Sequence, residues 1–577
     1  RRPGCGSTDL VEVELSRTGR IWSYTDAQYQ PPAPYVSPHE EFRPFTQAAV
    51  ELAEEQLVVM GQVVEGVGVA DLTTGTASGD LDAVTWYGGY RPVITLDPIG
   101  LADYPEETAI PNLCEPLLRV TPDYQLQPGL ATKFGYTDDT HYEITLRDDV
   151  TFWDGTPMTA EDVAFSLQRN LDPKYLSNYS GAFSQVTDVS VTGPQTVTVT
   201  LKQRSRNFEI ALGTLGSAVV QKAFTEQAGR AFGSPGTGVM CTGPFQFTSY
   251  DGTSKLVMTR YDGYWDAENA AHAGTFTFVY PADPAALANG LTSGKIDGGL
   301  SLPTNLVAGL QNAANGTLYV GGEGSTPINV DLLFTKSDGP SADPKVRQAL
   351  SQVIDRTAIA KTVFSDTADP LYKVSGPGVW GYAQDTYRAA YDGYVTEPDV
   401  EAAKALVEES GIGDQPLVFG YPAGDTESTQ IATVVQQEAD QIGLKIKLEG
   451  LPNQQYGALF ADPTAREPYD LILTKNYVEL PEPLSLDSLI GSTAGNMNFS
   501  GYQDAEVEQS LAEADATADD EARAQLVLAA ETKLAEALPA IPIAQPRALV
   551  FENDRLTGST LTFSYMTSPW AAAVGAK

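Results

Sequence analysis

Residues 71–80 (DLTTGTASGD) are small, polar and glycine-containing, and they separate two stretches of different pattern. Before them the chain shows short alternating runs typical of β-strands, whereas strands and helix-length segments alternate after Leu81. A chain of 577 residues also exceeds what one hydrophobic core usually supports. We therefore predict an N-terminal unit over residues 1–75, a linker at 76–80 and a second unit over 81–577.

The charge balance restricts the partners of this chain. It has 36 basic and 75 acidic residues, a formal net charge of −39, so it lacks the basic surface that nucleic acids require and is repelled by anionic membranes. A hydrophobic content of 42% excludes global disorder. No apolar run reaches 18 residues, which predicts no transmembrane segment, and the chain as it stands shows neither a signal peptide nor a lipid-anchor cysteine.

The sequence contains no recognisable catalytic constellation. We find no G-x-S-x-G elbow, no H-E-x-x-H zinc motif, no phosphate-binding loop and no G-x-G-x-x-G opening a helix. The three histidines lie far apart in the sequence, at positions 39, 141 and 272, which disfavours a histidine-rich metal site. The sequence therefore favours binding over catalysis, and we predict neither an enzyme, nor a cofactor, nor a metal.

The first unit reads as β structure. It resembles the OB-fold half of the two-part proteins, zinc ribbon plus OB fold, that accompany thiolases and other acyl-CoA enzymes. The residues that carry the resemblance are PGCGSTDLVEVELSRTGRIWSYT, PPAPY and VELAEEQLVVMGQV. Tetrahedral zinc needs four ligands, and only Cys5 is present, with no histidine nearer than His39. We therefore predict a partial OB-like barrel without zinc, and a cytosolic partner of an acyl-CoA enzyme remains an alternative function.

A strand, a turn and a helix follow one another at residues 142–169. YEITLR alternates as a strand, and WDGTP contains an Asp-Gly turn signal. Thr159 precedes AEDVAFSLQR as a helix N-cap, with Asp162 at the third helical position in a capping-box arrangement. Further along, DPKVRQALSQVIDR (343–356) predicts an amphipathic helix capped by Asp343, with Arg347 on its outer side.

The segment around VTFWDGTPMTAEDV is similar to the signature of the family 5 extracellular solute-binding proteins, the oligopeptide and dipeptide receptors of ABC importers. Further matches occur in the family's order along residues 80–577. They are LDP (96–98), EPLLRVTPDYQLQPGLA (115–131), GTGVMCTGPFQF (236–247), MTRYDGYW (258–265), LTSGKID (291–297), KVRQALSQVIDR (345–356) and GYQDAEVEQSL (501–511).

The resemblance implies an α/β, two-lobed periplasmic-binding-protein-like fold with an extra subdomain. Mapping the family onto this chain places lobe I at about 81–113, 185–276 and 545–577, the extra subdomain at about 114–184 and lobe II at about 277–544. The hinge crossovers would lie near 275–283 and 539–547. Cys114 and Cys241 fall in segments that this mapping brings together, so we expect a disulfide between them, consistent with export.

The resemblance further implies an extracytoplasmic receptor, expected as a monomer, that closes over a ligand and delivers it to the permease of an ABC importer. Oligopeptides or dipeptides are the first expectation. A non-peptide solute, such as an oligosaccharide, an opine or a chelate, is the alternative within the same fold.

In the peptide receptors an aspartate in lobe II pairs with the ligand amine. The corresponding stretch is TKNYVELPEPLSLDSL (474–489), which places Glu479 at the amine position and Asn476 where the family has Trp. The alternative for Glu479 is a solvated loop carboxylate, and for Trp380, in GPGVWGY, it is core packing. The residues predicted to bind the ligand are Tyr87, Tyr90, Trp380, Asn476, Tyr477 and Glu479.

Overall fold

The computed structural model describes residues 20–27, 45–52, 57–62, 72–281 and 283–577. The chain divides into two units, Arg1–Asp71 and Leu72–Lys577. In the first unit, three strands form an antiparallel sheet in the order β1-β2-β3, namely β1 (Arg20–Ala27), β2 (Phe45–Leu52) and β3 (Leu57–Gln62). The prediction that Cys5 and His39 bind no zinc falls outside the described residues.

A seven-stranded sheet organises the first part of the second unit. Its order is β11-β12-β13-β4-β14-β22-β15, and β4 runs parallel to both of its neighbours. The strands are β4 (Leu81–Tyr87), β11 (Phe245–Tyr250), β12 (Lys255–Arg260), β13 (Ala273–Val279), β14 (Gly298–Leu300), β15 (Gly316–Val320) and β22 (Leu549–Asn553).

Both faces of this sheet are covered, because successive side chains of a strand point to opposite sides. Trp86 of β4 packs on one face against Trp570 in the C-terminal segment, with ring centroids 5.3 Å apart. The next residue, Tyr87, packs on the other face with apolar residues of α5 (Pro284–Thr292) and α6 (Val307–Leu310).

A four-stranded antiparallel sheet with the order β7-β8-β10-β9 forms a subdomain. Its strands are β7 (Ala131–Tyr136), β8 (His141–Leu146), β9 (Val186–Gly193) and β10 (Thr196–Leu201). Helix α2 (Ala160–Gln168) packs on it, and the predicted capping box is confirmed. The Asp162 N–H donates to Thr159 Oγ1 (3.3 Å), and the Thr159 N–H donates to Asp162 Oδ2 (3.0 Å).

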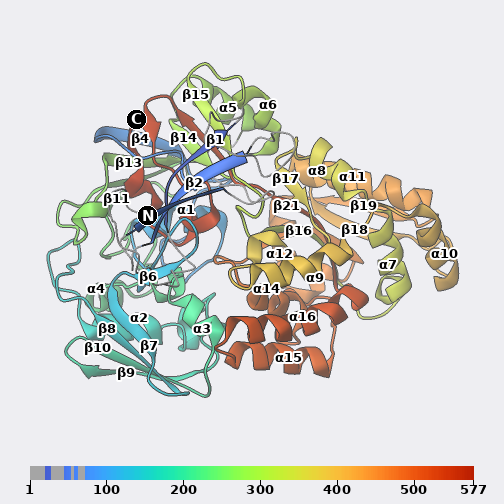
Figure 1. Ribbon diagram of the computed structural model, residues 1–577, viewed down its shortest axis with the longest axis horizontal. Coiled ribbons are helices and arrows are strands. Elements are labelled where there is room, and N and C mark those ends of the chain that lie inside the picture. Colours follow the sequence, from blue (N-terminus) through green and yellow to red (C-terminus); the bar gives the residue numbers. More distant parts are fainter. Residues whose placement is uncertain (1–19, 28–44, 53–56, 63–71, 282) are drawn as a thin grey trace, which may run out of the picture. The chain divides into compact units, whose positions relative to one another are not determined.

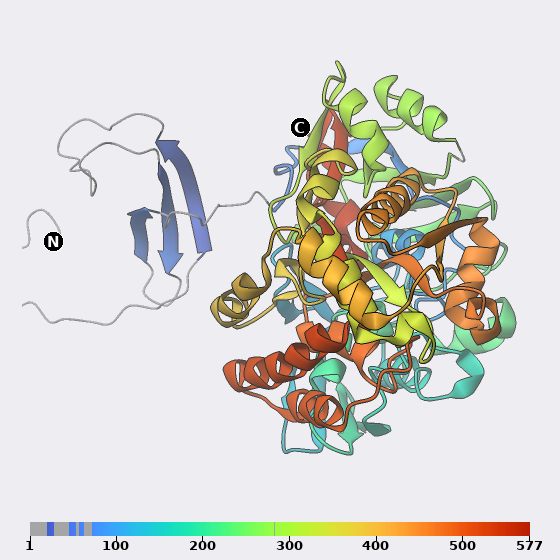
Figure 2. The same cartoon turned by 90° about the vertical axis from the view of Figure 1, so that its right-hand side faces the viewer.

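A six-stranded sheet, β17-β21-β16-β20-β18-β19, forms the other half of the second unit. Its central strand is buried along its whole length. The strands are β16 (Ile328–Phe334), β17 (Ala368–Pro370), β18 (Leu417–Pro422), β19 (Ile446–Leu451), β20 (Leu471–Tyr477) and β21 (Ala540–Pro546). The helices of this half include α7 (Pro344–Val353), α10 (Val400–Ser410), α11 (Thr426–Gln441), α14 (Pro483–Gly491), α15 (Ala505–Ala516) and α16 (Asp520–Ala537). In Figure 2, α15 and α16 are the red-orange helices that lie side by side.

Helix α7 departs from its predicted orientation at one residue. Asp343 caps the helix as predicted, accepting from the Lys345 N–H (2.9 Å). Arg347, however, is buried rather than outside: its Nε donates to the Ser341 carbonyl oxygen (2.7 Å), and its guanidinium lies over the Phe334 ring. Carbonyl acceptors and an aromatic face supplied by other elements make this burial possible.

Two crossovers connect the sheets, at residues 321–327 and 547–548. We propose lobe ranges on this basis, with 72–320 and 549–577 as the first lobe, including the subdomain, and 328–546 as the second lobe (Figure 1). These ranges differ from the predicted boundary near 277, because β14 and β15 pair with β22 in the seven-stranded sheet. The subdomain sheet likewise extends to Leu201, past the predicted end at 184. Among the described residues, no helix has both the length and the apolar character needed to cross a membrane.

Candidate functional site

Two aromatic residues predicted to bind the ligand lie in hydrophobic cores. Tyr87 ends β4 and is 5% exposed. Trp380 is 4% exposed; its indole N–H donates to the Ser375 carbonyl oxygen (3.3 Å), and its ring stacks on Tyr387. For Trp380 the structure shows the alternative, core packing. Neither side chain is part of the cluster that Tyr477 and Glu479 form with Glu107.

Asn476, in β20, is also buried, and its side chain hydrogen-bonds to a buried aspartate. Its Nδ2 donates to Oδ2 of Asp331 in the neighbouring strand β16 (3.0 Å). Burial raises the pKa of Asp331 to about 7. Asn476 thus contacts the partner strand of the sheet, not the residues of the other lobe.

The end of β20 meets the first lobe at α1 (Tyr104–Ala109). The Tyr477 hydroxyl donates to Oε2 of Glu107 in α1 (2.8 Å), and the Tyr179 hydroxyl donates to Oε1 of the same carboxylate (2.9 Å). Tyr179 belongs to the segment between η2 (Pro173–Tyr175) and β9. One buried carboxylate therefore joins the second lobe to two parts of the first.

Glu479 lies two residues beyond Tyr477, in the same region. Burial raises the pKa of Glu107 well above its ordinary value, and the negative charge of Glu479 is the next cause. Burial also raises the pKa of Glu479. Among the described residues, neither carboxylate forms an ion pair with a lysine, arginine or histidine. Glu107 is fully buried and Glu479 is half-buried. Two neighbouring carboxyl groups without a cationic partner favour a proton or a cation between them.

Aromatic rings surround this carboxyl pair. The Tyr104 and Tyr477 ring centroids are 4.8 Å apart, and Phe563 lies 5.4 Å from Tyr477. The Tyr104 hydroxyl is buried and has no hydrogen-bond partner in the described residues. Burial raises the pKa of Tyr104 well above its ordinary value. Aromatic rings therefore lie beside two carboxyl groups, a combination that binding sites for organic cations often have.

Tyr90 lies at the N-terminal end of α1. It is exposed, and its hydroxyl donates to Oδ2 of Asp103 (2.7 Å), the N-cap residue of that helix. The adjacent Arg91 forms ion pairs with Asp103 and with Glu106. Arg91 therefore forms its ion pairs with these two carboxylates and not with Glu107 or Glu479.

The sequence motifs indicated Tyr477 and Glu479 but not Glu107, Tyr104 or Tyr179. Glu107 is one of 75 acidic residues, and Asp103 followed by Tyr-Pro indicates only the start of a helix. No sequence signal marks Glu107 as buried, because its burial depends on β20 of the other lobe. The adjacent glutamates Glu106 and Glu107, shortly after Asp103, were the one available hint.

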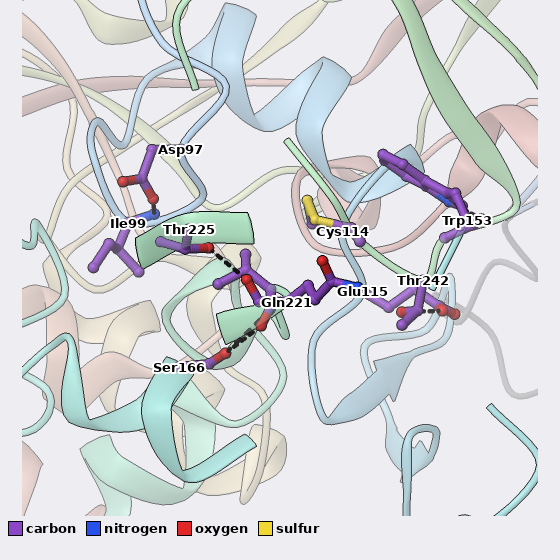
Figure 3. Close-up of a disulfide and its surroundings, with 12 residues drawn as sticks. Asp97, Ile99, Cys114, Glu115, Trp153, Ser166, Gln221, Thr225 and Thr242 are labelled. Carbon is purple, nitrogen blue, oxygen red and sulfur yellow. Dashed lines mark hydrogen bonds between the residues drawn. A yellow bond between two sulfur atoms is a disulfide. The ribbon is translucent and has the colours of Figure 1, made fainter. Parts of the chain in front are cut away.

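A disulfide holds the segment that follows α1. Cys114 and Cys241 are bonded, with their Cα atoms 5.0 Å apart. Beside the disulfide, the Thr242 hydroxyl donates to Oε2 of the buried Glu115 (3.1 Å) (Figure 3). The cross-link ties the chain after α1 to the segment that enters β11, and so helps to fix α1 in place.

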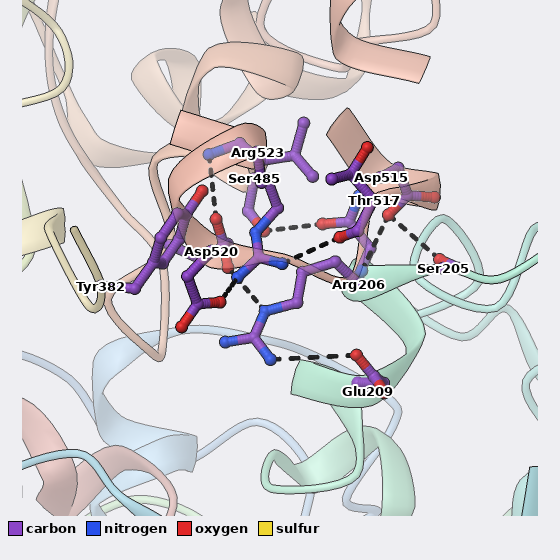
Figure 4. Close-up of polar contacts among 12 residues, drawn as sticks. Ser205, Arg206, Glu209, Tyr382, Ser485, Asp515, Thr517, Asp520 and Arg523 are labelled. Carbon is purple, nitrogen blue, oxygen red and sulfur yellow. Dashed lines mark hydrogen bonds and ion pairs between the residues drawn. The ribbon is translucent and has the colours of Figure 1, made fainter. Parts of the chain in front are cut away.

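A second contact joins the lobes away from the carboxyl pair (Figure 4). Arg206, at the start of α3 (Arg206–Ala211), donates through Nε to Oε2 of the buried Glu482 in the second lobe (2.9 Å). Oδ1 of Asp515, in α15, accepts from the Ser205 hydroxyl (3.1 Å) and from the Asn207 N–H (2.9 Å). We call Ser205, Arg206, Asn207, Glu482 and Asp515 the interlobe latch.

Two known protein families match parts of this chain. The profile of the bacterial extracellular solute-binding proteins, family 5, matches residues 125–498. The chain belongs to this family. The resemblance seen in the sequence motifs is therefore confirmed for the second unit. The profile of the ChsH2 C-terminal OB-fold domain matches residues 12–76, which confirms the OB-fold resemblance of the first.

Family 5 relatives cover most of the chain. The periplasmic murein peptide-binding protein MppA of Escherichia coli K12 is 26% identical over 485 residues, which are 80% of this chain and 86% of MppA. The Bacillus subtilis oligopeptide-binding protein AppA, solved with a nonapeptide, has a TM-score of 0.74 at 18% identity and covers 86% of this chain and 99% of its own. AgaA from A. tumefacien R10, solved with agropinic acid, has a TM-score of 0.73 at 22% identity and covers 86% and 98%. These structures confirm the two-lobed α/β fold class.

Proposed function

We propose that this family 5 solute-binding protein is an extracytoplasmic receptor for solutes that carry a protonated amine, foremost short peptides, which it delivers to an ABC importer. The observation that carries the proposal is the pair formed by Glu107, which is buried, and Glu479, which is half-buried. One comes from each lobe, and neither has a cationic partner in the described residues. A buried ammonium needs such acceptors, since it is costly to desolvate unpaired.

In this proposal, ligand binding and closure of the lobes favour each other, because the ligand contacts both lobes only in the closed form. Glu479 and Tyr477 come from the second lobe, whereas Glu107 comes from the first. An amine held between them contacts both lobes only in the closed form, so its binding favours closure. The two short crossovers, 321–327 and 547–548, are the proposed hinge, and the permease recognises the closed receptor.

The relatives support peptides as the first ligand class. MppA is named for murein peptides, and AppA was solved with a nonapeptide. AgaA was solved with agropinic acid, so a non-peptide solute is the alternative within the fold. The carboxyl pair favours ligands with an amine, and peptides provide one at every N-terminus.

Native mass spectrometry of the protein purified without denaturation tests the ligand class. A series of retained masses separated by amino-acid residue masses supports peptides, and a single mass without an amine contradicts the proposal. Calorimetry then compares trialanine with N-acetyl-trialanine, which lacks the charged amine. We expect Glu479→Gln to weaken trialanine binding about 10- to 100-fold, the range of one charge-assisted hydrogen bond.

The matched control is Glu467→Gln, an exposed glutamate of the second lobe, which should bind like the wild type. Glu107→Gln tests the other half of the pair and should weaken binding similarly. Equal affinity for trialanine and its acetylated form would show that the carboxyl pair does not bind the amine.

A second function is proposed for the N-terminal unit alone, on the basis of the OB-fold match at residues 12–76. It is contact with an acyl-CoA enzyme, the alternative class stated from the sequence. Co-purification with a thiolase-like subunit from the source cells supports it. Recovery of the chain in the extracytoplasmic fraction without such a subunit contradicts it.

A further inference from the structure

A small cavity of about 30 Å³ lies inside the second lobe. The segment after β17 contributes Lys373 and Ser375 to its lining, α14 contributes Asp487, and α16 contributes Glu531. A cavity needs roughly 10–15 Å³ to hold a water molecule, so this one accepts a water or an ion of comparable size. Neither Glu107 nor Glu479 lines this cavity, so it is separate from the carboxyl pair.

Four buried oxygen atoms at this cavity have no hydrogen-bond partner in the described residues. They are Oδ1 and Oδ2 of Asp487, Oε1 of Glu531 and Oγ of Ser375. The residues are 1%, 3% and 1% exposed, respectively. Carboxylate oxygens only accept hydrogen bonds, and buried polar atoms are almost always satisfied in native proteins. Unpartnered acceptors from three segments therefore indicate an occupant that donates or carries positive charge.

The charges around the cavity determine the valence of that occupant. Lys373 forms an ion pair with Glu531 through Oε2. With Asp487 and Glu531 ionised, the three side chains sum to one negative charge, which one monovalent cation neutralises. The buried Glu482 also acts electrostatically on Asp487 but forms an ion pair with Arg206. A divalent ion would leave a net positive charge in the interior, and buried net charge is costly.

We propose that this cavity binds one monovalent cation of sodium or potassium size, coordinated by Asp487, Glu531 Oε1 and Ser375 Oγ. Oxygen ligands are those that hard cations prefer. The ion links α14, α16 and the segment after β17, and so stabilises the second lobe.

A proton is the competing occupant. Burial, followed by the charge of Glu531, raises the pKa of Asp487 well above its ordinary value, so a protonated Asp487 could donate to Glu531. Because the cation and the proton occupy the same site, the cation's stabilising effect should weaken as pH falls.

The test is thermal unfolding of the full chain, dialysed into choline chloride and titrated with sodium or potassium chloride at constant ionic strength. We expect a saturable rise of about 2–4 °C in the unfolding temperature for the wild type. Asp487→Asn should lose this response. Glu536→Gln, which changes an exposed carboxylate of α16, the helix that carries Glu531, should keep it.

Two further measurements apply even if Asp487→Asn folds poorly. Sodium-23 NMR of the wild type should show line broadening that potassium reverses. Ser375→Ala, which changes no charge, should require several-fold more sodium for the same rise in unfolding temperature. Equal unfolding temperatures in sodium, potassium and choline at pH 8, with no sodium line broadening, would show that a proton or water occupies the cavity and would overturn the proposal.

Discussion

Asp331 illustrates how burial controls single residues in this protein. It lies in the central strand β16, fully buried, and the Asn476 amide donates to it. Burial raises its pKa to about 7, from roughly 3.9 in an unfolded chain. Between about pH 4 and pH 7 the native state therefore holds a proton that the unfolded state has lost. Its stabilising contribution is complete below about pH 4 and disappears as pH rises through 7.

We accordingly expect Asp331→Asn to be more stable than the wild type at pH 8, by about 2–4 kcal/mol, because the amide stays neutral and keeps an oxygen for Asn476. At pH 4 the two proteins should differ little. Urea unfolding at both pH values measures this. Asp148→Asn, at an exposed aspartate, is the control. A variant whose advantage does not grow with pH would show that Asp331 does not titrate in this window.

The same dependence on burial limited the prediction of the candidate site. Glu479 and Tyr477 were found because a family motif has a fixed place in the chain. Glu107 was not, since its role follows from a contact with the other lobe. Trp380 lies in a Gly/Pro loop that suggested exposure, yet Tyr387 and Tyr391 pack against its ring.

At the scale of elements, local signals predicted the helix starts. The capping box at Thr159 and the Asp343 cap involve residues within three positions of each other, so the sequence contains all of their determinants. The burial of Arg347 involves the Ser341 carbonyl and the Phe334 ring, contacts that no periodicity reveals.

The disulfide acts between elements and closes a loop with a sequence separation of 127. We expect the double variant Cys114→Ser, Cys241→Ser to lower the free energy of unfolding by about 2–5 kcal/mol, because the unfolded chain regains conformational freedom. Urea unfolding measures the change, and Cys5→Ser is the control for a cysteine substitution. Reduction of the wild type should reproduce the loss. An unchanged urea midpoint would mean that the cross-link does not restrict the unfolded chain.

At the scale of the whole molecule, the interlobe latch bears on the equilibrium between open and closed forms. Arg206 and Asp515 join parts that the proposed hinge motion would separate. Contacts present only in the closed form add to ligand affinity by favouring that form.

We expect the double variant Arg206→Ala, Asp515→Ala to bind the ligand about 5- to 30-fold more weakly, corresponding to about 1–2 kcal/mol of lost closed-state stability. Its radius of gyration without ligand, measured by small-angle X-ray scattering, should exceed that of the wild type. Arg230→Ala, at an exposed arginine of the same lobe, should change neither quantity. Unaltered ligand affinity in the double variant would show that the interlobe latch does not stabilise the closed form.

The sequence by itself determined the separation into two units, the family of each, the α/β class and the local helix starts, because these depend on composition, motif order and short-range hydrogen bonds. The family motif also placed Glu479 and Tyr477 among the residues expected to bind the ligand. Only the tertiary structure decided that β14 and β15 join the first sheet, that Arg347 and Trp380 are buried, and that Glu107 faces the second lobe. These features depend on groups far apart in the chain, and burial, which sets their charge states, exists only after the lobes have packed.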